Sequence, residues 1–278
     1  MSLFVQTNVA SLQAQEDFGK TEVALNKTME QLSSGYKINN AGDDAAGIGM
    51  ASRLTAQVAS YTSASQNAND ALSMTQTADG GAAQIGDILT RMRQLAVEGA
   101  NGTVSAADAT NLNTEFSAQL NEINQIANTT TYNGISLLSG AAANTTFQVG
   151  INTTASDSLT VSFGGADNTA SGLNLSAATV ATTGGATAAI TSIDAAIQTL
   201  STVRAGFGAA MDGLQDIVSN IGSMSTNTSA ALSQVQDVDV ASATAQLAQQ
   251  QVLSQAGESV LSQANQTPQL AESLIRGQ

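Results

Sequence analysis

The chain has 278 residues, a single Pro, no His, no Cys and a formal net charge of -14. An acidic chain repels phosphate backbones and anionic lipids, so we expect neither nucleic acid nor a membrane as its partner. Without imidazole or thiol groups the chain cannot build the usual His- and Cys-based catalytic or zinc sites, and we expect no enzymatic activity and no cofactor.

Residues 1–42 are predicted to form an N-terminal helical arm followed by a connecting loop. Apolar residues recur at helical spacing over residues 3–33, but they are too few to stabilise an isolated helix. Such a segment is expected to order only when a partner supplies buried surface. The seam through which this arm should pack consists of Val5, Val9, Leu12, Leu25, Met29 and Leu32.

Residues 43–140 are predicted to contribute the N-terminal helices of a bundle. Their apolar residues step by three and four, with a phase skip near Thr75 that would disturb a supercoil locally. Asn101-Gly102 is expected to break the first helix, and Ser105 with Asp108 to begin the next one as a capping box. The expected core residues of this segment are Leu54, Val58, Leu72, Ile85, Leu89, Met92, Phe116 and Ile123.

Residues 141–188 have a different pattern. Alternation of polar and apolar residues around a Thr/Ser/Asp turn predicts a β-hairpin with strands at residues 145–151 and 158–163. Residues 164–188 are mostly Gly, Ala, Ser and Thr, which predicts a loop or a very small outer lobe.

Residues 189–236 are predicted to form one long C-terminal helix of the bundle. A 3.5-residue repeat sustained for about six heptads is typical of helices that supercoil against a partner. At 1.5 Å per residue such a helix would be roughly 70 Å long, so we expect a rod rather than a globule. Its expected core residues are Ile197, Leu200, Phe207, Leu214, Val218 and Ile221.

Residues 237–278 are predicted to form the C-terminal arm. The acidic pairs Asp43-Asp44 and Asp237/Asp239 each precede an Ala-rich helical pattern, so we interpret them as helix N-terminal caps. The fold class expected from all segments is mainly α, with long antiparallel coiled-coil helices (terminal arms plus bundle), a small β-hairpin and little or no outer domain. The seam residues of this arm are Val240, Leu247, Leu253, Val260, Leu270 and Leu274.

Long stretches of the chain also resemble bacterial flagellins. The likeness covers residues 3–140 and about 190–275, and includes the segments NVASLQAQEDFGKTEVALNKTMEQLSSGYKINNAGDD, ALSMTQTADGGAAQIGDILTRMRQLAVEGANGT and DVDVASATAQLAQQQVLSQAGESVLSQANQTPQLAESLI. The resemblance implies a secreted, extracellular structural subunit that self-assembles into the tubular filament of the bacterial flagellum and serves swimming motility. It implies a short, minimal form in which the arms pair as an antiparallel coiled coil.

The resemblance leaves an alternative, the hook-filament junction protein, which shares the arm architecture. A flagellin carrying a zinc peptidase would need an HExxH helix, and the absence of His excludes it. The implied partners are further copies of the chain, the flagellar cap and hook-associated proteins, a flagellin export chaperone and the flagellar export apparatus.

The resemblance also implies a patch for a Toll-like receptor of innate immunity. The positions that match this patch are Arg91, Leu95 and Glu115. The alternative is that these residues only make contacts between subunits, which we favour because many bacteria never meet a host.

Overall fold

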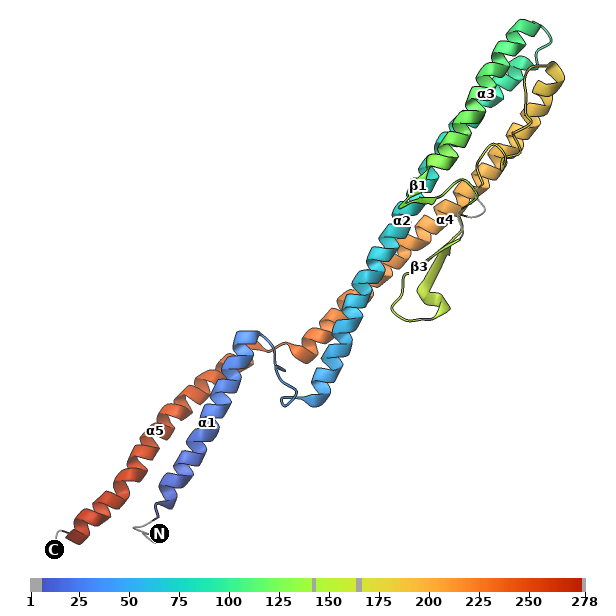
Figure 1. The fold of residues 1–278 in the computed structure, drawn as a ribbon. Helices are drawn as coiled ribbons and strands as arrows, with labels where there is room; N and C mark the ends of the chain where they lie inside the picture. Colours follow the sequence, from blue (N-terminus) through green and yellow to red (C-terminus); the bar gives the residue numbers. More distant parts are fainter. Residues whose placement is uncertain (1–6, 142–143, 164–166, 277–278) are drawn as a thin grey trace. The chain divides into compact units, whose positions relative to one another are not determined.

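The computed structural model describes residues 7–141, 144–163 and 167–276, with side chains as far as residue 266 in the last helix. The predicted seam residue Val5, and the side chains of Leu270 and Leu274, therefore lie outside the described residues. The described ranges are mainly α, as predicted (Figure 1). Their α-helices are α1 (Val9–Ser34), α2 (Ala45–Gly99), α3 (Ala106–Thr129), α4 (Thr183–Gln236) and α5 (Val240–Arg276).

One member of each acidic pair caps a helix as predicted. Asp44 Oδ1 accepts hydrogen bonds from the backbone N–H groups of Ala46 (3.1 Å) and Gly47 (2.8 Å) at the start of α2. Asp239 Oδ1 does the same for the first turn of α5. At α3, Ser105 Oγ accepts from the N–H of Asp108, which confirms the predicted helix start. These caps satisfy backbone N–H donors of the first helical turn, which have no partner within the helix.

The chain divides into two compact units. The terminal unit comprises residues 1–56 and 227–278, and the central unit comprises residues 57–226. The predicted segment boundaries at residues 42/43 and 236/237 fall in the connections between α1 and α2 and between α4 and α5. Within the described residues, no helix combines the length and the hydropathy needed to cross a bilayer.

In the central unit, α2 buries one uninterrupted stripe, so the predicted phase skip is wrong. Thr75 is fully buried and in register, and its Oγ1 donates a 2.8 Å hydrogen bond to the carbonyl of Ala71. A hydroxyl satisfied within its own helix can occupy a core position that hydropathy alone would reject. The stripe consists of Ala64, Ala68, Ala71, Thr75, Ala78, Ala82, Ile85, Leu89, Met92, Ala96 and Gly99.

Most of the expected bundle-core residues are buried in the structure. The fully buried ones are Ile85, Leu89, Met92, Phe116, Ile123, Leu200, Phe207, Leu214 and Ile221. The half-buried ones are Leu54, Val58, Leu72, Ile197 and Val218, and Leu54 belongs to the terminal unit. The core also takes in Phe163, whose ring centroid lies 5.7 Å from that of Phe207. Strand and loop residues therefore complete a core that the helices begin.

Two small antiparallel pairs of strands are present in the described ranges. Strand β3 (Thr145–Gln148) pairs with β4 (Ser158–Val161), which confirms the predicted hairpin with shorter strands. Strand β1 (Thr131–Tyr132) pairs with β2 (Ile135–Ser136), and the sequence analysis missed this hairpin. The available signal was Asn133-Gly134, since this pair favours a two-residue turn with positive φ at both positions.

Residues 167–182 form a loop, as predicted, but it packs along α3 and does not form a separate lobe. Asn113 Oδ1 accepts hydrogen bonds from Thr179 Oγ1 (2.7 Å) and Val180 N–H (3.0 Å). Three apolar residues of the loop are buried in the core: Leu173, Leu175 and Val180. Helix α4 begins at Thr183, earlier than the predicted residue 189, because Thr182 Oγ1 caps it by accepting from Gly185 N–H.

Candidate functional site: the terminal helix pair

Helices α1 and α5 of the terminal unit pack side by side and antiparallel (Figure 1). At one end, Asn8 Nδ2 donates to the carbonyl of Ala264 (2.8 Å) and Ser11 Oγ donates to Asn265 Oδ1 (2.7 Å). At the other end, Val238 N–H donates to the carbonyl of Gly35 (3.0 Å). Residues separated by most of the sequence are thus direct neighbours in this unit.

The seam of the pair is made mainly of small and polar side chains. Ser11, Thr28 and Ala243 are its buried residues. Phe18 lies over Gly257, where an added Cβ would be only 3.1 Å from the Phe18 ring. Half-buried residues continue the seam at heptad spacing: Ala14, Phe18, Thr21, Leu25 and Leu32 on α1, and Leu247, Gln250, Ser254, Gly257, Leu261 and Ala264 on α5.

Part of the predicted arm seam is wrong for a single chain. Leu25, Leu32 and Leu247 are half-buried at the seam, but six other predicted residues are between 49% and 59% exposed. The physical reason is that small residues at most of the facing positions let the two helices approach closely. These six larger residues therefore lie on other faces of the helices. The six exposed residues are Val9, Leu12, Met29, Val240, Leu253 and Val260.

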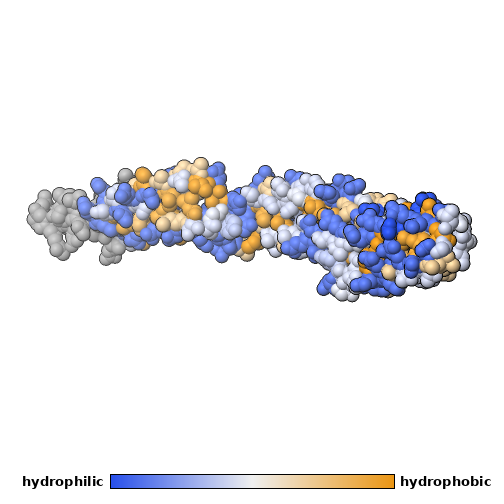
Figure 2. Space-filling view, turned by 90° about the horizontal axis from the view of Figure 1, so that it is seen from above, coloured by the Kyte–Doolittle hydropathy of each residue, from blue (hydrophilic) through white to orange (hydrophobic). Residues whose placement is uncertain are grey.

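The terminal unit consequently carries large apolar side chains on its surface, and Figure 2 shows them in orange toward the left of the view. An exposed apolar patch of a soluble protein typically marks an interaction surface. Helix α5 is also nearly uncharged, since Glu258 is the sole charged residue between Val240 and Gln266. We call the following residues the exposed apolar set: Val9, Leu12, Val23, Met29, Val240, Val252, Leu253 and Val260.

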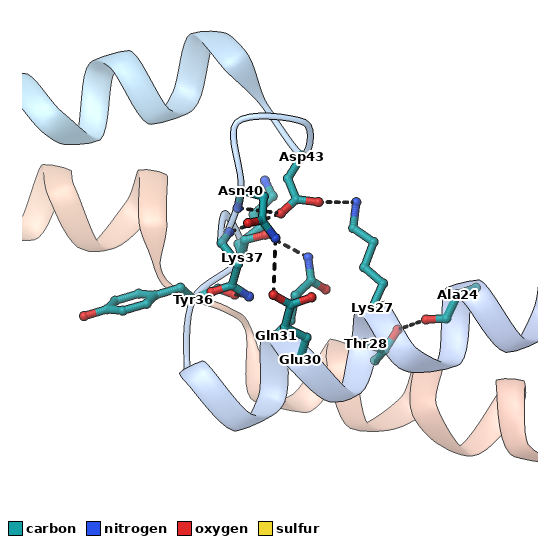
Figure 3. Close-up of polar contacts among 10 residues, drawn as sticks. Ala24, Lys27, Thr28, Glu30, Gln31, Tyr36, Lys37, Asn40 and Asp43 are labelled. Atoms are coloured by element: carbon teal, nitrogen blue, oxygen red, sulfur yellow. Dashed lines mark hydrogen bonds and ion pairs between the residues drawn. The ribbon is translucent and has the colours of Figure 1, made fainter.

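The loop between α1 and α2 is fastened to α1 by side-chain contacts (Figure 3). Lys27 Nζ lies 2.7 Å from Asp43 Oδ1, and Asp43 Oδ2 accepts hydrogen bonds from the N–H groups of Asn39 and Asn40. The hydrogen bond from Lys27 and those two backbone donors lower the pKa of Asp43. Gln31 Nε2 further donates to the carbonyl of Lys37 (2.7 Å). These contacts fix the conformation of the loop against α1.

The same loop also pairs with the connection between α4 and α5. Tyr36 and Asp237 form an isolated antiparallel bridge, in which Lys37 N–H donates to the carbonyl of Gln236 (2.7 Å). Gly35 makes this possible because its positive φ of 77° ends α1 and turns the chain. The two connections of the terminal unit are therefore tied to each other by backbone hydrogen bonds.

The residues of the predicted receptor patch have two different environments in the central unit. Arg91 and Glu115 are at the surface and form a 2.7 Å ion pair between α2 and α3. Leu95 is 1% exposed and belongs to the core, so its assignment to an exposed patch is wrong. Its position on the buried face of α2, three residues after Met92, explains the difference.

The described residues contain no group of three or more acidic side chains arranged to hold a metal ion. Several ionisable side chains form ion pairs between helices. Arg93 Nε lies 2.6 Å from Asp194 Oδ1, and Arg204 Nε lies 2.8 Å from Asp79 Oδ1.

Comparison with known proteins shows matches along nearly the whole chain. The family models for the bacterial flagellin N-terminal and C-terminal helical regions match residues 5–143 and 190–275. The flagellin of Listeria innocua is 35% identical over 283 residues, which covers 98% of this chain and 99% of that protein. The flagellin of Bacillus subtilis is 33% identical over 302 residues, with the same coverage of 98% and 99%.

Two solved structures are also similar to this chain. A crystal structure of Bacillus cereus flagellin is 33% identical, with a TM-score of 0.50 over 60% of this chain and 94% of that one. A structure titled as a putative flagellar hook-associated protein from Vibrio parahaemolyticus has a TM-score of 0.57 over 70% of this chain and 100% of its own, but its 13% identity shows a shared fold alone. The chain belongs to the bacterial flagellin family and is a structural subunit of the flagellar filament.

Proposed function

We propose that the exposed apolar set of the terminal unit is the surface through which copies of this chain polymerise into a tubular filament. The observation that supports this proposal is that α1 and α5 pair mainly through small and polar residues and leave the large apolar residues of the exposed apolar set in water. Full burial of one such side chain contributes roughly 1.5–3 kcal/mol. Packing against neighbouring copies therefore gives these helices the burial that they do not give each other.

The charge distribution supports the same proposal. Burying a charged group without a partner is costly, so a helix that becomes buried between neighbouring subunits should carry few charges. Helix α5 meets this requirement between Val240 and Gln266, where Glu258 is its one ionisable residue. The filament would then bury α5 at low electrostatic cost.

The family resemblance supports the remaining parts of the proposal. The chain is exported with the help of a chaperone and the flagellar export apparatus, and is added to the filament outside the cell next to the cap and hook-associated proteins. The chain has no catalytic role in this process. For Arg91 and Glu115 we favour a role in packing of the bundle and in contacts between subunits over receptor binding, because they already pair with each other.

Seeded polymerisation of depolymerised protein tests the role of the exposed apolar set. The double variant Leu253→Gln/Val260→Gln keeps good helix formers on an exposed face, so the monomer should retain its helical circular dichroism. Its addition to filament seeds should fail, because the proposed contact has lost its apolar surface. Electron microscopy of the seeds measures their elongation.

Two matched variants complete the experiment. Met224→Gln changes an exposed apolar residue of the central unit and should elongate seeds normally. Leu247→Gln changes the seam and should lower the helix content of the monomer. Normal elongation by the double variant would refute the proposed surface.

A further inference from the structure

Two Asn-Gly pairs lie on the surface of the central unit, and the fold holds them in different backbone states. Asn101-Gly102 lies in the loop between α2 and α3, and Asn133-Gly134 lies between β1 and β2 (Figure 1). All four of these residues are exposed. Asn followed by Gly is the dipeptide most open to intramolecular attack, because Gly places no side chain beside its backbone nitrogen.

The backbone of Asn133 is fixed by the turn in which it lies. Tyr132 pairs with Ile135, so Asn133 and Gly134 are the two central residues of the hairpin turn. Their φ angles are 47° and 80°, as a type I′ turn requires. Both φ and ψ of Asn133 therefore define the turn, and rotating ψ would break the strand pairing.

Asn101 is the first residue of its turn, and its own ψ is less constrained. The turn is closed by a 3.1 Å hydrogen bond from Val104 N–H to the Asn101 carbonyl. The dihedral angles that define a β-turn are those of the two central residues, here Gly102 and Thr103. A rotation of ψ at Asn101 is opposed by hydrogen bonds of the turn but by no strand pairing.

The side chain of Asn101 is also oriented toward the following backbone. Asn101 Oδ1 accepts a hydrogen bond from Thr103 N–H at 3.3 Å, which is an Asx turn. This geometry folds the side-chain amide over the peptide that contains the Gly102 nitrogen. A hydrogen-bond donor on an amide oxygen also stabilises the negative charge that develops there during nucleophilic attack.

We propose that Asn101-Gly102 is a site of spontaneous deamidation and that the hairpin protects Asn133-Gly134 from the same reaction. The Gly102 nitrogen attacks Asn101 Cγ, its proton passes to solvent base, and the side-chain nitrogen takes up a proton and leaves as ammonia. Water then opens the cyclic imide at either carbonyl and gives Asp or isoaspartate. The net reaction converts Asn and water into an acid and ammonia.

The reaction changes the end of α2. It adds a negative charge two residues after Gly99, the last residue of that helix, and near Glu98. A negative charge at a helix C-terminus interacts unfavourably with the helix dipole. The product should therefore be more acidic than the starting protein and less ordered at this loop.

The test is incubation of the folded full-length protein at mildly alkaline pH, followed by digestion with a protease that cuts after Glu and Asp. Unconverted Asn101 is then in the fragment 99–108 and unconverted Asn133 in the fragment 123–157. Conversion to Asp adds a cleavage site after the converted residue, so the shorter fragments count as product together with the uncut isoaspartyl fragment. Mass spectrometry measures conversion at each Asn, and an isoaspartyl methyltransferase measures the isoaspartate. We expect Asn101 to react faster by about tenfold, the effect of a barrier difference of about 1.4 kcal/mol.

The same incubation in concentrated urea separates the effect of the fold from that of the sequence. Unfolding should bring the two rates together, since both dipeptides are Asn-Gly. A ratio that is the same in urea and in buffer would overturn the proposal. Faster conversion of Asn133 than of Asn101 in the folded protein would overturn it as well.

Gly102→Ala tests the reaction path. Nothing lies within 4 Å of a Cβ built at Gly102, and its φ is outside the left-handed region, so this variant should fold normally. Its Cβ hinders attack by the backbone nitrogen and should slow the conversion of Asn101 while leaving Asn133 unaffected. An unchanged rate at Asn101 would refute the cyclic imide path.

Discussion

Two glycines of the terminal helix pair have opposite structural roles. Gly257 faces Phe18, whereas nothing lies within 4 Å of a Cβ built at Gly19. Gly→Ala in an open helix position stabilises the helix by about 0.8–1.0 kcal/mol. We expect Gly19→Ala to raise the thermal midpoint of the terminal helices, and Gly257→Ala to lose this gain because the new methyl group crowds the Phe18 ring in the seam.

Circular dichroism of the dilute monomer measures both midpoints. Phe18→Ala supplies the complement, since removing the ring makes room for the Gly257→Ala methyl group. In the Phe18→Ala background, Gly257→Ala should therefore stabilise the helix by the gain expected from helix propensity, because the methyl group no longer meets the ring. Equal stabilisation by Gly19→Ala and Gly257→Ala would contradict the seam described for α1 and α5.

Leu95 and Val97 are close in sequence on α2 but differ in burial. Leu95 is 1% exposed in the central core, and Val97 is 51% exposed. Truncation of a buried Leu to Ala costs about 2–5 kcal/mol, because a cavity is left behind. Leu95→Ala should lower the free energy of unfolding of the central unit by this amount, and Val97→Ala should change it little. Urea unfolding gives both free energies. A similar decrease for the two variants would contradict the burial of Leu95.

The residues that sequence predicted well are the large apolar ones of the central unit. Ile85, Leu89 and Met92 are predicted because their size and spacing give a strong signal. Ser11, Thr28 and Ala243 could not be predicted as a seam, because small and polar residues give no hydropathy signal. Their burial follows from how closely α1 and α5 approach, which is a property of the pair and not of either sequence segment.

At the scale of elements, ion pairs connect helices that are distant in sequence. Arg93 on α2 pairs with Asp194 on α4 through hydrogen bonds, and this contact lowers the pKa of Asp194. A carboxyl group with a lowered pKa stabilises the fold above its ordinary pKa, and this contribution is lost as the pH falls through the lowered value. The pair therefore contributes at neutral pH and not in strong acid.

Asp194→Asn tests this contribution. At neutral pH the variant should unfold at slightly lower urea concentration than the parent, because an exposed pair contributes little. The difference should vanish in acid below the lowered pKa, where the parent carboxyl is protonated too. Asp212→Asn is the control, since Asp212 is exposed on α4 and forms none of the ion pairs among the described residues. A difference that persists in acid would mean that Asp194 acts through something other than its charge.

The elements themselves were predictable to different degrees. Starts of helices with an acidic or hydroxyl cap, such as Asp44, Ser105 and Asp239, follow from local chemistry and were predicted. The start of α4 at Thr183 was not, because two glycines follow it and disfavour a helix locally. A Cβ built at Gly185 would lie only 3.0 Å from the carbonyl oxygen of Thr179, so packing at this position favours glycine.

At the scale of the whole molecule, the division into a terminal and a central unit suggests that the units can be separated. Deletion of residues 240–278 removes α5 and with it the partner of α1. We expect the truncated chain to lose filament formation while the central unit stays helical, because its core lies within residues 57–226. Circular dichroism and electron microscopy check the two outcomes. Normal filaments from the truncated chain would show that assembly does not depend on α5.

The tip of the β3–β4 hairpin is closed in a way that suits it to carry foreign sequence. The backbone carbonyl of Asp157 accepts hydrogen bonds of 2.8 Å from the N–H groups of both Val149 and Gly150, so the two strands meet below the tip. The intervening residues 152–156 are exposed and contribute no core side chain. Exposed loop tips whose ends lie close together tolerate inserted segments. A peptide epitope spliced between Thr153 and Thr154 would thus be carried once by every subunit of the polymer.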